Sequence, residues 1–241
     1  MRVSRIYLDQ PLTQGQQIRP DERARRYIGQ VLRLRPGQSL TLFNGDGTDY
    51  AAELLQCDRR ECRVLVGEPG DTEPPAPLKV HLAIGISRGE RMDFAIQKSV
   101  ELGVQAITPL HTTRSQVQLA GARLEKRLDH WRGVIVSACE QSGRNRIPCL
   151  NPPASIQAWL EAHDQGLLLH HAAECSLPEL PPPGAALNLL VGPEGGLTPE
   201  ERAQAVDGGL TAVRLGPRVM RTETAPLAAL AAIQTLWGDL R

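Results

Sequence analysis

The chain has 241 residues, of which 41% are hydrophobic, 22% are charged and 3% are aromatic, and its formal net charge at pH 7 is zero. This length can supply a hydrophobic core for one large domain or two ordinary ones, so we expect the chain to fold on its own. The start of the chain lacks the apolar run of a secretory signal and no later stretch approaches a bilayer span, which predicts a soluble cytoplasmic protein with no membrane partner.

Cysteine and histidine residues show no spacing that is typical of a metal site. The five cysteines include no CxxC pair, and apart from the adjacent His170 and His171 the six histidines are scattered. The pattern indicates neither a disulfide framework nor a zinc site. We therefore expect reduced thiols and no bound metal.

Basic and acidic blocks alternate along the chain. Residues 1–35 contain eight basic and three acidic side chains, residues 81–150 contain ten and six, and the block that follows each of them is acidic. The basic blocks could bind a polyanion, although runs of charge are more often solvated faces.

The N-terminal part predicts a small β-rich domain with one helix. Apolar residues recur at helical spacing over 21–34, directly after Pro20. Residues 39–55 predict a hairpin around the turn residues Asn-Gly-Asp-Gly, and residues 61–68 predict a further strand.

A proline-rich segment at 71–77 lacks hydrophobic periodicity and predicts a linker. We therefore divide the chain into a first domain at 1–72 and a second at 73–241.

In the second domain, apolar runs alternate with helical patterns, and the near-continuous apolar runs predict strands that are buried on both faces. This is typical of an α/β fold in which crossover helices cover a parallel sheet. Ligands of such sheets bind beyond the carboxyl ends of the strands. The expected strands are 78–87, 104–110, 166–171, 186–192 and 211–216, and the expected helices are 90–103, 121–143, 198–209 and a last helix starting at Thr224.

The loop GPEGG at 192–196 follows one of these strands and precedes a capping box formed by Thr198 and Glu201. It matches neither the GxxxxGK[ST] nor the GxGxxG phosphate-binding pattern. Glu194 would repel a pyrophosphate, so a ligand with positive charge, such as S-adenosylmethionine, fits this loop better. A tight turn between strand and helix, with no ligand, explains the glycines equally well.

The stretch LGPRVMRTETA at 215–225 gathers charged residues at a turn before the last helix. Thr222 or Thr224 is expected to cap that helix. Capping leaves Arg218, Arg221 and Glu223 unexplained, which favours a ligand site over a simple turn.

Taken together, four motifs resemble the RsmE family of ribosomal RNA methyltransferases in the SPOUT superfamily. GPEGGLTPEE and LGPRVMRTETA look like the cofactor loops of the family, and SRGERMDFAIQKSVELGVQAITPL and ACEQSGRNRIP look like its other two signatures. The resemblance implies an N-terminal PUA-like β-barrel that binds RNA and a C-terminal SPOUT α/β domain with a parallel sheet and a trefoil knot. It also implies a homodimer.

The activity implied by the resemblance is transfer of a methyl group from S-adenosyl-L-methionine to N3 of a uridine in the 16S ribosomal RNA of the small ribosomal subunit. Because N3 carries a proton, the enzyme must accept that proton and stabilise negative charge on the base. Arg218 or Arg221 is the candidate for charge stabilisation, and Glu223, or second to it Glu194, is the candidate base. Each of these side chains could instead form a structural ion pair.

The same resemblance predicts which residues hold the cofactor, mostly through their backbone. They are Leu169, His170, Gly192, Pro193, Glu194, Gly195, Gly196, Leu215, Gly216, Val219, Met220 and Thr222.

Basic residues that flank two of the signatures are expected to contact RNA phosphates, unless they form a solvated face. They are Arg88, Arg91, Lys98, Arg144 and Arg146. Two other functions remain open at this point. One is an RNA-binding module without catalysis, and the other is a nucleotide-dependent oxidoreductase, against which the missing GxGxxG pattern counts.

Overall fold

The computed structural model describes residues 3–115, 117 and 119–240. The chain forms two compact units, each made of two segments. Unit 1 contains Met1–Pro75 and Val136–Ile147, and unit 2 contains Ala76–Ile135 and Pro148–Arg241. From the sequence we expected one domain boundary, after residue 72. In the structure the chain leaves unit 1 after Pro75 and returns to it for residues Val136–Ile147.

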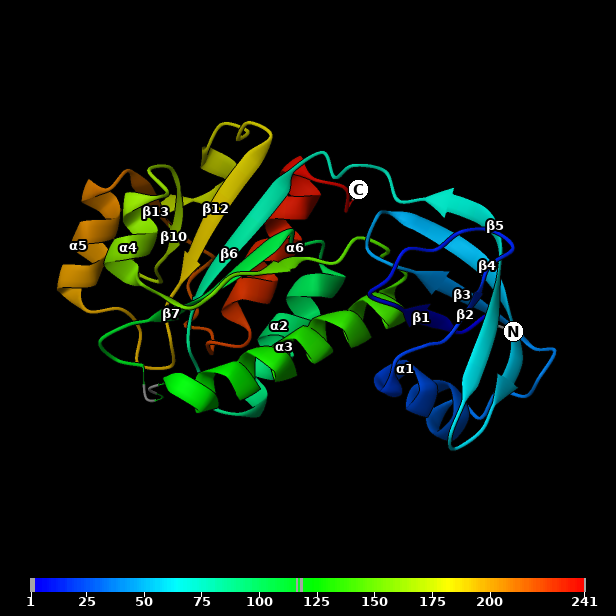
Figure 1. The fold of residues 1–241 in the computed structure, drawn as a ribbon. Coiled ribbons are helices and arrows are strands. Elements are labelled where there is room, and N and C mark those ends of the chain that lie inside the picture. The colour runs from blue at the N-terminus through cyan, green and yellow to red at the C-terminus, as the bar shows by residue number, and fades with distance from the viewer. Residues whose placement is uncertain (1–2, 116, 118, 241) are drawn as a thin grey trace. The chain divides into compact units, whose positions relative to one another are not determined.

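Unit 1 is built on a five-stranded sheet in the order β1-β3-β4-β5-β2 (Figure 1). β1 pairs with β3 in parallel, and the other neighbours pair in antiparallel fashion. The hairpin expected at 39–55 is present as β3 and β4. The strands are β1 (Arg5–Tyr7), β2 (Gln17–Ile18), β3 (Ser39–Phe43), β4 (Thr48–Cys57) and β5 (Cys62–Thr72).

Alternate residues of these strands supply the core of unit 1. In β5, Cys62, Val64 and Val66 are buried, as expected for a strand with one face on the core. β5 continues past residue 68 to Thr72 in spite of Pro69, so the start of the expected linker is part of a strand.

The helix expected at 21–34 is shorter and less regular than its pattern predicts. Asp21 caps α1 (Glu22–Arg26), where its Oδ1 accepts a hydrogen bond from the N–H of Ala24 at 2.7 Å. A π-helical turn, η1 (Tyr27–Val31), follows and buries Ile28. Arg33 then adopts a φ of 52°, which ends the helical path.

The residues of the signature ACEQSGRNRIP begin at the end of α3 (Gly121–Ser142), and Val136–Ile147 belongs to unit 1. The buried Glu140 carboxylate accepts hydrogen bonds from the N–H of Tyr7 at 3.0 Å and from Nη1 of Arg23 at 3.1 Å. Burial raises the pKa of the Glu140 carboxyl, although these two donors oppose the shift.

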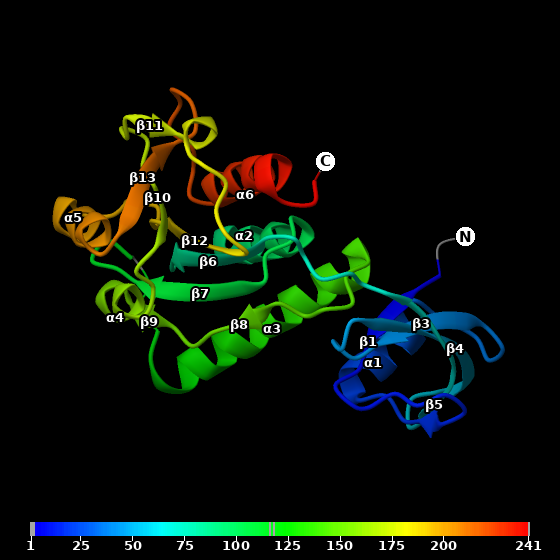
Figure 2. The ribbon, with the colours of Figure 1, turned by 90° about the horizontal axis from the view of Figure 1, so that it is seen from above.

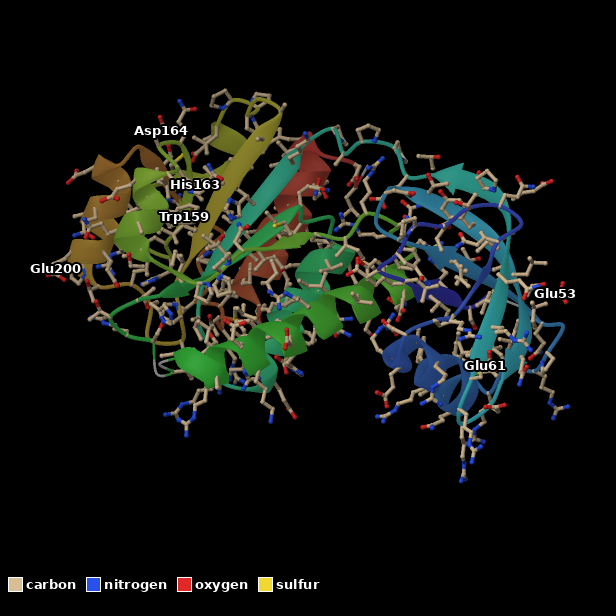
Figure 3. The ribbon with its side chains drawn as sticks, viewed as in Figure 1. Glu53, Glu61, Trp159, His163, Asp164 and Glu200 are labelled. Carbon is tan, nitrogen blue, oxygen red and sulfur yellow. The ribbon has the colours of Figure 1, made fainter. Side chains whose placement is uncertain are left out.

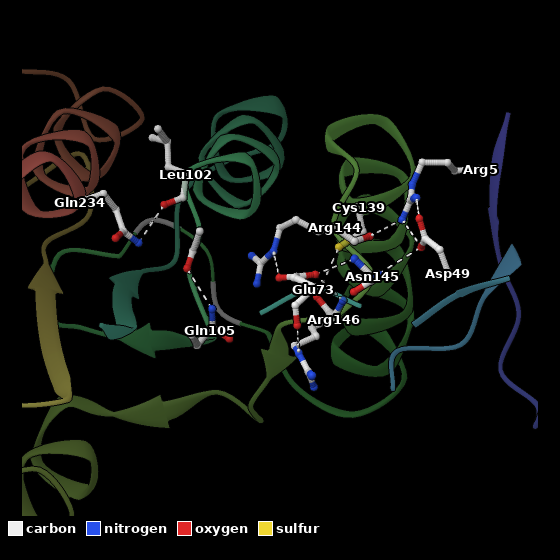
Figure 4. Close-up of polar contacts among 11 residues, drawn as sticks. Arg5, Asp49, Glu73, Leu102, Gln105, Cys139, Arg144, Asn145, Arg146 and Gln234 are labelled. Carbon is white, nitrogen blue, oxygen red and sulfur yellow. Dashed lines mark hydrogen bonds and ion pairs between the residues drawn. The ribbon is translucent and has the colours of Figure 1, made fainter. Parts of the chain in front are cut away.

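A second carboxylate in unit 1, that of Glu73, holds the turn after α3 (Figure 4). Its Oε2 accepts hydrogen bonds from the N–H of Asn145 at 2.7 Å and from the N–H of Arg146 at 2.9 Å. The Asn145 amide donates in turn to Asp49, which also pairs with Arg5. These contacts fix the third signature within unit 1.

Unit 2 contains an eight-stranded sheet in the order β11-β13-β10-β12-β6-β7-β8, with β9 also paired to β7 (Figures 1 and 2). All of its pairings are parallel. The five strands expected from the sequence are β6 (Lys79–Gly85), β7 (Ala106–His111), β10 (Gly166–Leu169), β12 (Ala186–Val191) and β13 (Leu210–Arg214). The sequence did not predict the two-residue strands β8 (Cys149–Leu150), β9 (Ala154–Ser155) and β11 (Cys175–Ser176).

Helices cover this sheet as expected for an α/β fold, which confirms the predicted fold class. α2 and α6 lie side by side, and α4 and α5 pack on β10 and β12 through a shared apolar cluster that includes Trp159, Leu168, Leu190 and Ala205 (Figure 2). The elements are α2 (Glu90–Glu101), α4 (Ile156–Glu161), the 3-10 turn η2 (Leu177–Glu179), α5 (Pro199–Asp207) and α6 (Ala225–Trp237). Thr224 is the N-cap of α6, in agreement with its expected start.

Candidate functional site

Unit 2 has a cavity of about 590 Å³ beyond the carboxyl ends of β10, β12 and β13. The loops that follow these three strands supply most of its lining. Every residue predicted to hold the cofactor lines this cavity, with the exception of Gly216. The three predicted catalytic residues, Arg218, Arg221 and Glu223, line it as well. The structure therefore brings the two loops singled out in the sequence to one place.

The glycine loop after β12 makes a tight turn into α5. The N–H of Gly196 donates to the carbonyl of Pro193 at 2.8 Å, and Gly196 has a φ of 66°, a conformation that favours glycine. The expected capping box is present: the Thr198 hydroxyl accepts from the N–H of Glu201 at 3.2 Å, and Oε2 of Glu201 accepts from the N–H of Thr198 at 2.8 Å.

One hydrogen bond joins the glycine loop to the loop before α6. The hydroxyl of the buried Thr222 donates to the carbonyl of Gly192 at 3.0 Å. The sequence offered Thr222 or Thr224 as the helix cap, but Thr224 occupies the N-cap without a side-chain hydrogen bond. Thr222 thus connects the two loops rather than capping the helix.

Glu194 is held as a carboxylate at the cavity wall. Its Oε1 accepts from the N–H of Arg88 at 3.0 Å and lies 3.5 Å from Nη1 of Arg91. Burial raises the pKa of Glu194, but its backbone and side-chain hydrogen bonds and the Arg91 charge outweigh burial, so the pKa lies below its ordinary value. Glu194 therefore keeps a negative charge in the cavity at neutral pH.

The loop at 216–223 leaves its polar groups available. Within the described residues, the side chains of Arg218, Arg221 and Glu223 form no ion pair or hydrogen bond, and the backbone N–H groups between Gly216 and Arg221 donate to no protein group. The structural ion pairs considered for these side chains are thus not formed. Their free donors and acceptors face a cavity that can take a polar ligand.

The residues predicted to contact RNA are divided between the two units. Arg91 lines the cavity, Arg88 is exposed near Glu194, and Lys98 pairs with Glu101 at 2.7 Å. Arg144 and Arg146 belong to unit 1, where the Glu73 carboxylate lies 3.7 Å from Nε of Arg144 and accepts from the N–H of Arg146. An RNA contact at these two residues stays a prediction, and the structure gives them a second role in holding unit 1 together.

Seven lining residues were not predicted from the sequence, and three of them carry polar side chains: Arg114, His171 and Arg202. Arg114 follows β7, so its place at the carboxyl end of a parallel strand was a usable signal. Arg202 lies inside α5, and nothing in its local sequence points to the cavity.

The described residues contain neither a membrane-spanning helix nor a cluster of metal ligands. No helix in that part combines the length and apolar character needed to cross a bilayer. Nor do any three or more of its His, Cys, Asp or Glu side chains come together in a way that could hold a metal ion.

Family comparisons match both parts of the chain. A family described as an RNA methyltransferase domain matches residues 74–234, and a family described as an RNA methyltransferase PUA domain matches residues 20–66. The first of these spans well over half of the chain.

Individual relatives agree with the family matches. The ribosomal RNA small subunit methyltransferase E of Buchnera aphidicola subsp. Schizaphis graminum is 34% identical over 99% of this chain and 98% of its own length. Its Bacillus subtilis counterpart is 33% identical over 88% and 89%. The crystal structure of the Neisseria gonorrhoeae counterpart, bound to S-adenosyl methionine, is 40% identical over the full length of both chains with a TM-score of 0.92.

Proposed function

Because the chain belongs to the family of RNA methyltransferases that contains the ribosomal RNA small subunit methyltransferase E proteins, we propose that it transfers a methyl group from S-adenosyl-L-methionine to N3 of a uridine in 16S ribosomal RNA. One observation carries this proposal. The two loops of the family-like motifs line one cavity, which holds the ionised Glu194 carboxylate and three side chains without a partner among the described residues: Arg218, Arg221 and Glu223.

The cavity fits the proposed cofactor in charge and in hydrogen-bonding groups. S-adenosylmethionine supplies an electrophilic methyl group on a positively charged sulfur, and the ionised Glu194 matches that charge. The unpaired N–H groups between Gly216 and Arg221 can bind polar groups of the ligand. An added Cβ at Gly196 would meet no protein atom within 4 Å, so glycine leaves space open at the cavity wall.

Glu223 is the proposed base that accepts the N3 proton. Its carboxylate lines the cavity and has no partner among the described residues, so it is free to contact a substrate. Glu194 is the weaker candidate because its Oε1 already accepts from Arg88 and its lowered pKa makes it a poorer proton acceptor.

Arg218 and Arg221 are the proposed groups that stabilise negative charge on the uracil ring. Both are exposed at the cavity and both lack an acidic partner among the described residues, so their positive charge is not neutralised within the protein. Donors fixed near a developing anion lower the barrier of the reaction.

RNA binding is proposed to involve Arg88 and Arg91 in unit 2 together with unit 1, whose family match is the PUA domain of RNA methyltransferases. We further propose that the chain acts as a homodimer in the cytoplasm and that unit 2 contains a trefoil knot, as family membership suggests.

Nucleoside analysis of 16S ribosomal RNA tests the proposal. Cells that lack the protein are expected to lose one 3-methyluridine, and the wild-type gene is expected to restore it, whereas a gene encoding Glu223→Gln is not. Unchanged 3-methyluridine in the deletion strain would refute the proposal. An RNA-binding module without catalysis would bind ribosomal RNA but show no calorimetric binding of S-adenosylmethionine.

A further inference from the structure

Two arginines outside the cofactor motifs bind the backbone of the glycine loop. Nη1 of Arg114 donates to the carbonyl of Gly195 at 3.1 Å, and Nη1 of Arg202 donates to the carbonyl of Leu197 at 2.7 Å. Arg114 comes from the loop after β7 and Arg202 from α5, and both line the cavity. The two bonds lie on either side of Gly196.

Each arginine completes the hydrogen bonding of one peptide group. In the peptide between Gly195 and Gly196, Arg114 binds the carbonyl and the N–H donates to Pro193. In the peptide between Leu197 and Thr198, Arg202 binds the carbonyl and the N–H donates to Glu201. A peptide group held at both ends cannot rotate without breaking two hydrogen bonds.

The peptide between these two is different. Its carbonyl, from Gly196, and its N–H, from Leu197, have no hydrogen-bond partner among the described residues. Both residues line the cavity. Because glycine gives the backbone wide freedom at this point, the direction of the free peptide depends on how firmly its neighbours are held.

The Arg114 side chain is itself well fixed at its base. The preceding residue, Thr113, donates its N–H to Oε1 of Glu201 at 2.7 Å, and Glu201 is only 5% exposed. A Cβ at Gly195 would lie 3.0 Å from the Cβ of Arg114, so Arg114 packs closely against the loop at Gly195. Glu201 therefore holds both the loop of Arg114 and the start of α5.

We propose that Arg114 and Arg202 are positioning residues for the cofactor. By holding the carbonyls of Gly195 and Leu197, they orient the free peptide between Gly196 and Leu197 toward the ligand before the ligand arrives. This preorganisation lowers the entropy lost on binding. The inference rests on the proposed function, since it assigns a role in binding S-adenosylmethionine.

A simpler role for both arginines is to attract RNA phosphates, and binding measurements with each ligand alone separate the two roles. The variants are Arg114→Gln, Arg114→Lys and Arg202→Gln, with Arg132→Gln as a control. Arg132 is an exposed arginine on α3 whose one partner among the described residues is Asp129 at 2.7 Å, so its variant removes the same charge away from the cavity.

Calorimetry without RNA is expected to show S-adenosylmethionine binding weakened about threefold to tenfold by each glutamine variant, the range for one net hydrogen bond. Arg114→Lys is expected to recover part of this loss because lysine can still donate to Gly195. RNA affinity without cofactor is expected to stay within about twofold of wild type. In turnover assays, KM for S-adenosylmethionine is expected to rise more than KM for RNA.

Two results would overturn the inference alone: cofactor affinity equal to wild type in both glutamine variants, or weaker RNA binding with unchanged cofactor affinity. A wild-type chain that binds no S-adenosylmethionine would overturn the proposed function and this inference with it. Melting temperatures of all variants within a few degrees of the control would show that a fall in affinity is not due to unfolding.

Discussion

The Thr222 hydroxyl donates a 3.0 Å hydrogen bond to the carbonyl of Gly192, and this contact joins two loops that are about thirty residues apart in the chain. Each loop follows a different strand of the same parallel sheet, β12 for Gly192 and β13 for Thr222. The cavity wall depends on both loops, so a contact between them controls its shape.

Thr222→Val is expected to weaken S-adenosylmethionine binding and to destabilise the chain by about 1–2 kcal/mol, because it leaves the Gly192 carbonyl without its donor. Calorimetry and urea unfolding measure the two effects. Thr224→Val is the matched control, since the Thr224 side chain makes no capping bond. Equal behaviour of the two variants would show that the bond to Gly192 is unimportant.

Glu194→Gln is expected to weaken cofactor binding roughly tenfold at pH 7, through loss of one negative charge near the positive sulfur. In the wild type the lowered pKa keeps Glu194 ionised, so the contribution of Glu194 to affinity should be constant from about pH 8 down to pH 5 and fall only below the ordinary pKa of 4.5. The stabilising effect of the ionised carboxylate on the fold is likewise present above pH 4.5 and lost as pH falls through the lowered pKa.

Calorimetry across this pH range checks the prediction for Glu194, with Glu174→Gln as a control for an exposed carboxylate that does not line the cavity. An affinity for the cofactor that is the same in Glu194→Gln and wild type would contradict a charge-based role.

Glu223→Gln is expected to reduce turnover by about a hundredfold or more while cofactor affinity changes less than about twofold, because a general base acts on the chemical step. Single-turnover methylation of ribosomal RNA measures the rate of the chemical step, and calorimetry measures the cofactor affinity. Glu223→Asp should retain part of the activity, since the carboxylate remains. Turnover at the wild-type rate in Glu223→Gln would remove this residue as the base.

His81 on β6 lies in an aromatic cluster with Trp159 and His163. Trp159 and His163 lie at the end of α4 (Figure 3). Its Nε2 is 2.7 Å from the Thr108 hydroxyl, and its ring centroid is 4.9 Å from that of His163. Burial, followed by the effect of His163, lowers the pKa of His81 from 6.5 to about 4.

Acid is therefore expected to destabilise the chain through His81. Between pH 6.5 and about 4 the unfolded chain binds a proton that the folded chain rejects, so stability falls as pH drops through this window. The expected contribution is about 1–2 kcal/mol, reduced from the full shift because the side chain is partly exposed. Urea unfolding at several pH values should show that the free energy of unfolding falls less with decreasing pH in His81→Asn than in the wild type. The same pH dependence in both proteins would show that His81 is not the cause.

The long apolar strands of unit 2 could be predicted because burial on both faces leaves a near-continuous apolar run such as Leu187–Val191, which only Asn188 interrupts. Strands of two residues, such as β8 and β11, carry no period and exist only through pairing with a long neighbour. The helix at 21–34 was predicted too long because periodicity does not register the π-helical turn at Tyr27–Val31 or the positive φ of Arg33.

The candidate site could be predicted where polar residues interrupt an apolar pattern, as Glu194 and Arg218 do. Arg202 could not be predicted in this way, because an arginine on a helix surface is the ordinary case and only the fold places it beside Leu197. The role of Thr222 also depends on a contact thirty residues away, which local capping rules do not describe.

The decisive measurement is methyl transfer from S-adenosylmethionine with a deuterated methyl group, by the purified chain, to 16S ribosomal RNA or small ribosomal subunits. Mass spectrometry of the digested RNA is expected to find the label in 3-methyluridine at a single position, and to find none with Glu223→Gln. Label on another atom or base, or no label with a protein that binds both ligands, would contradict the account.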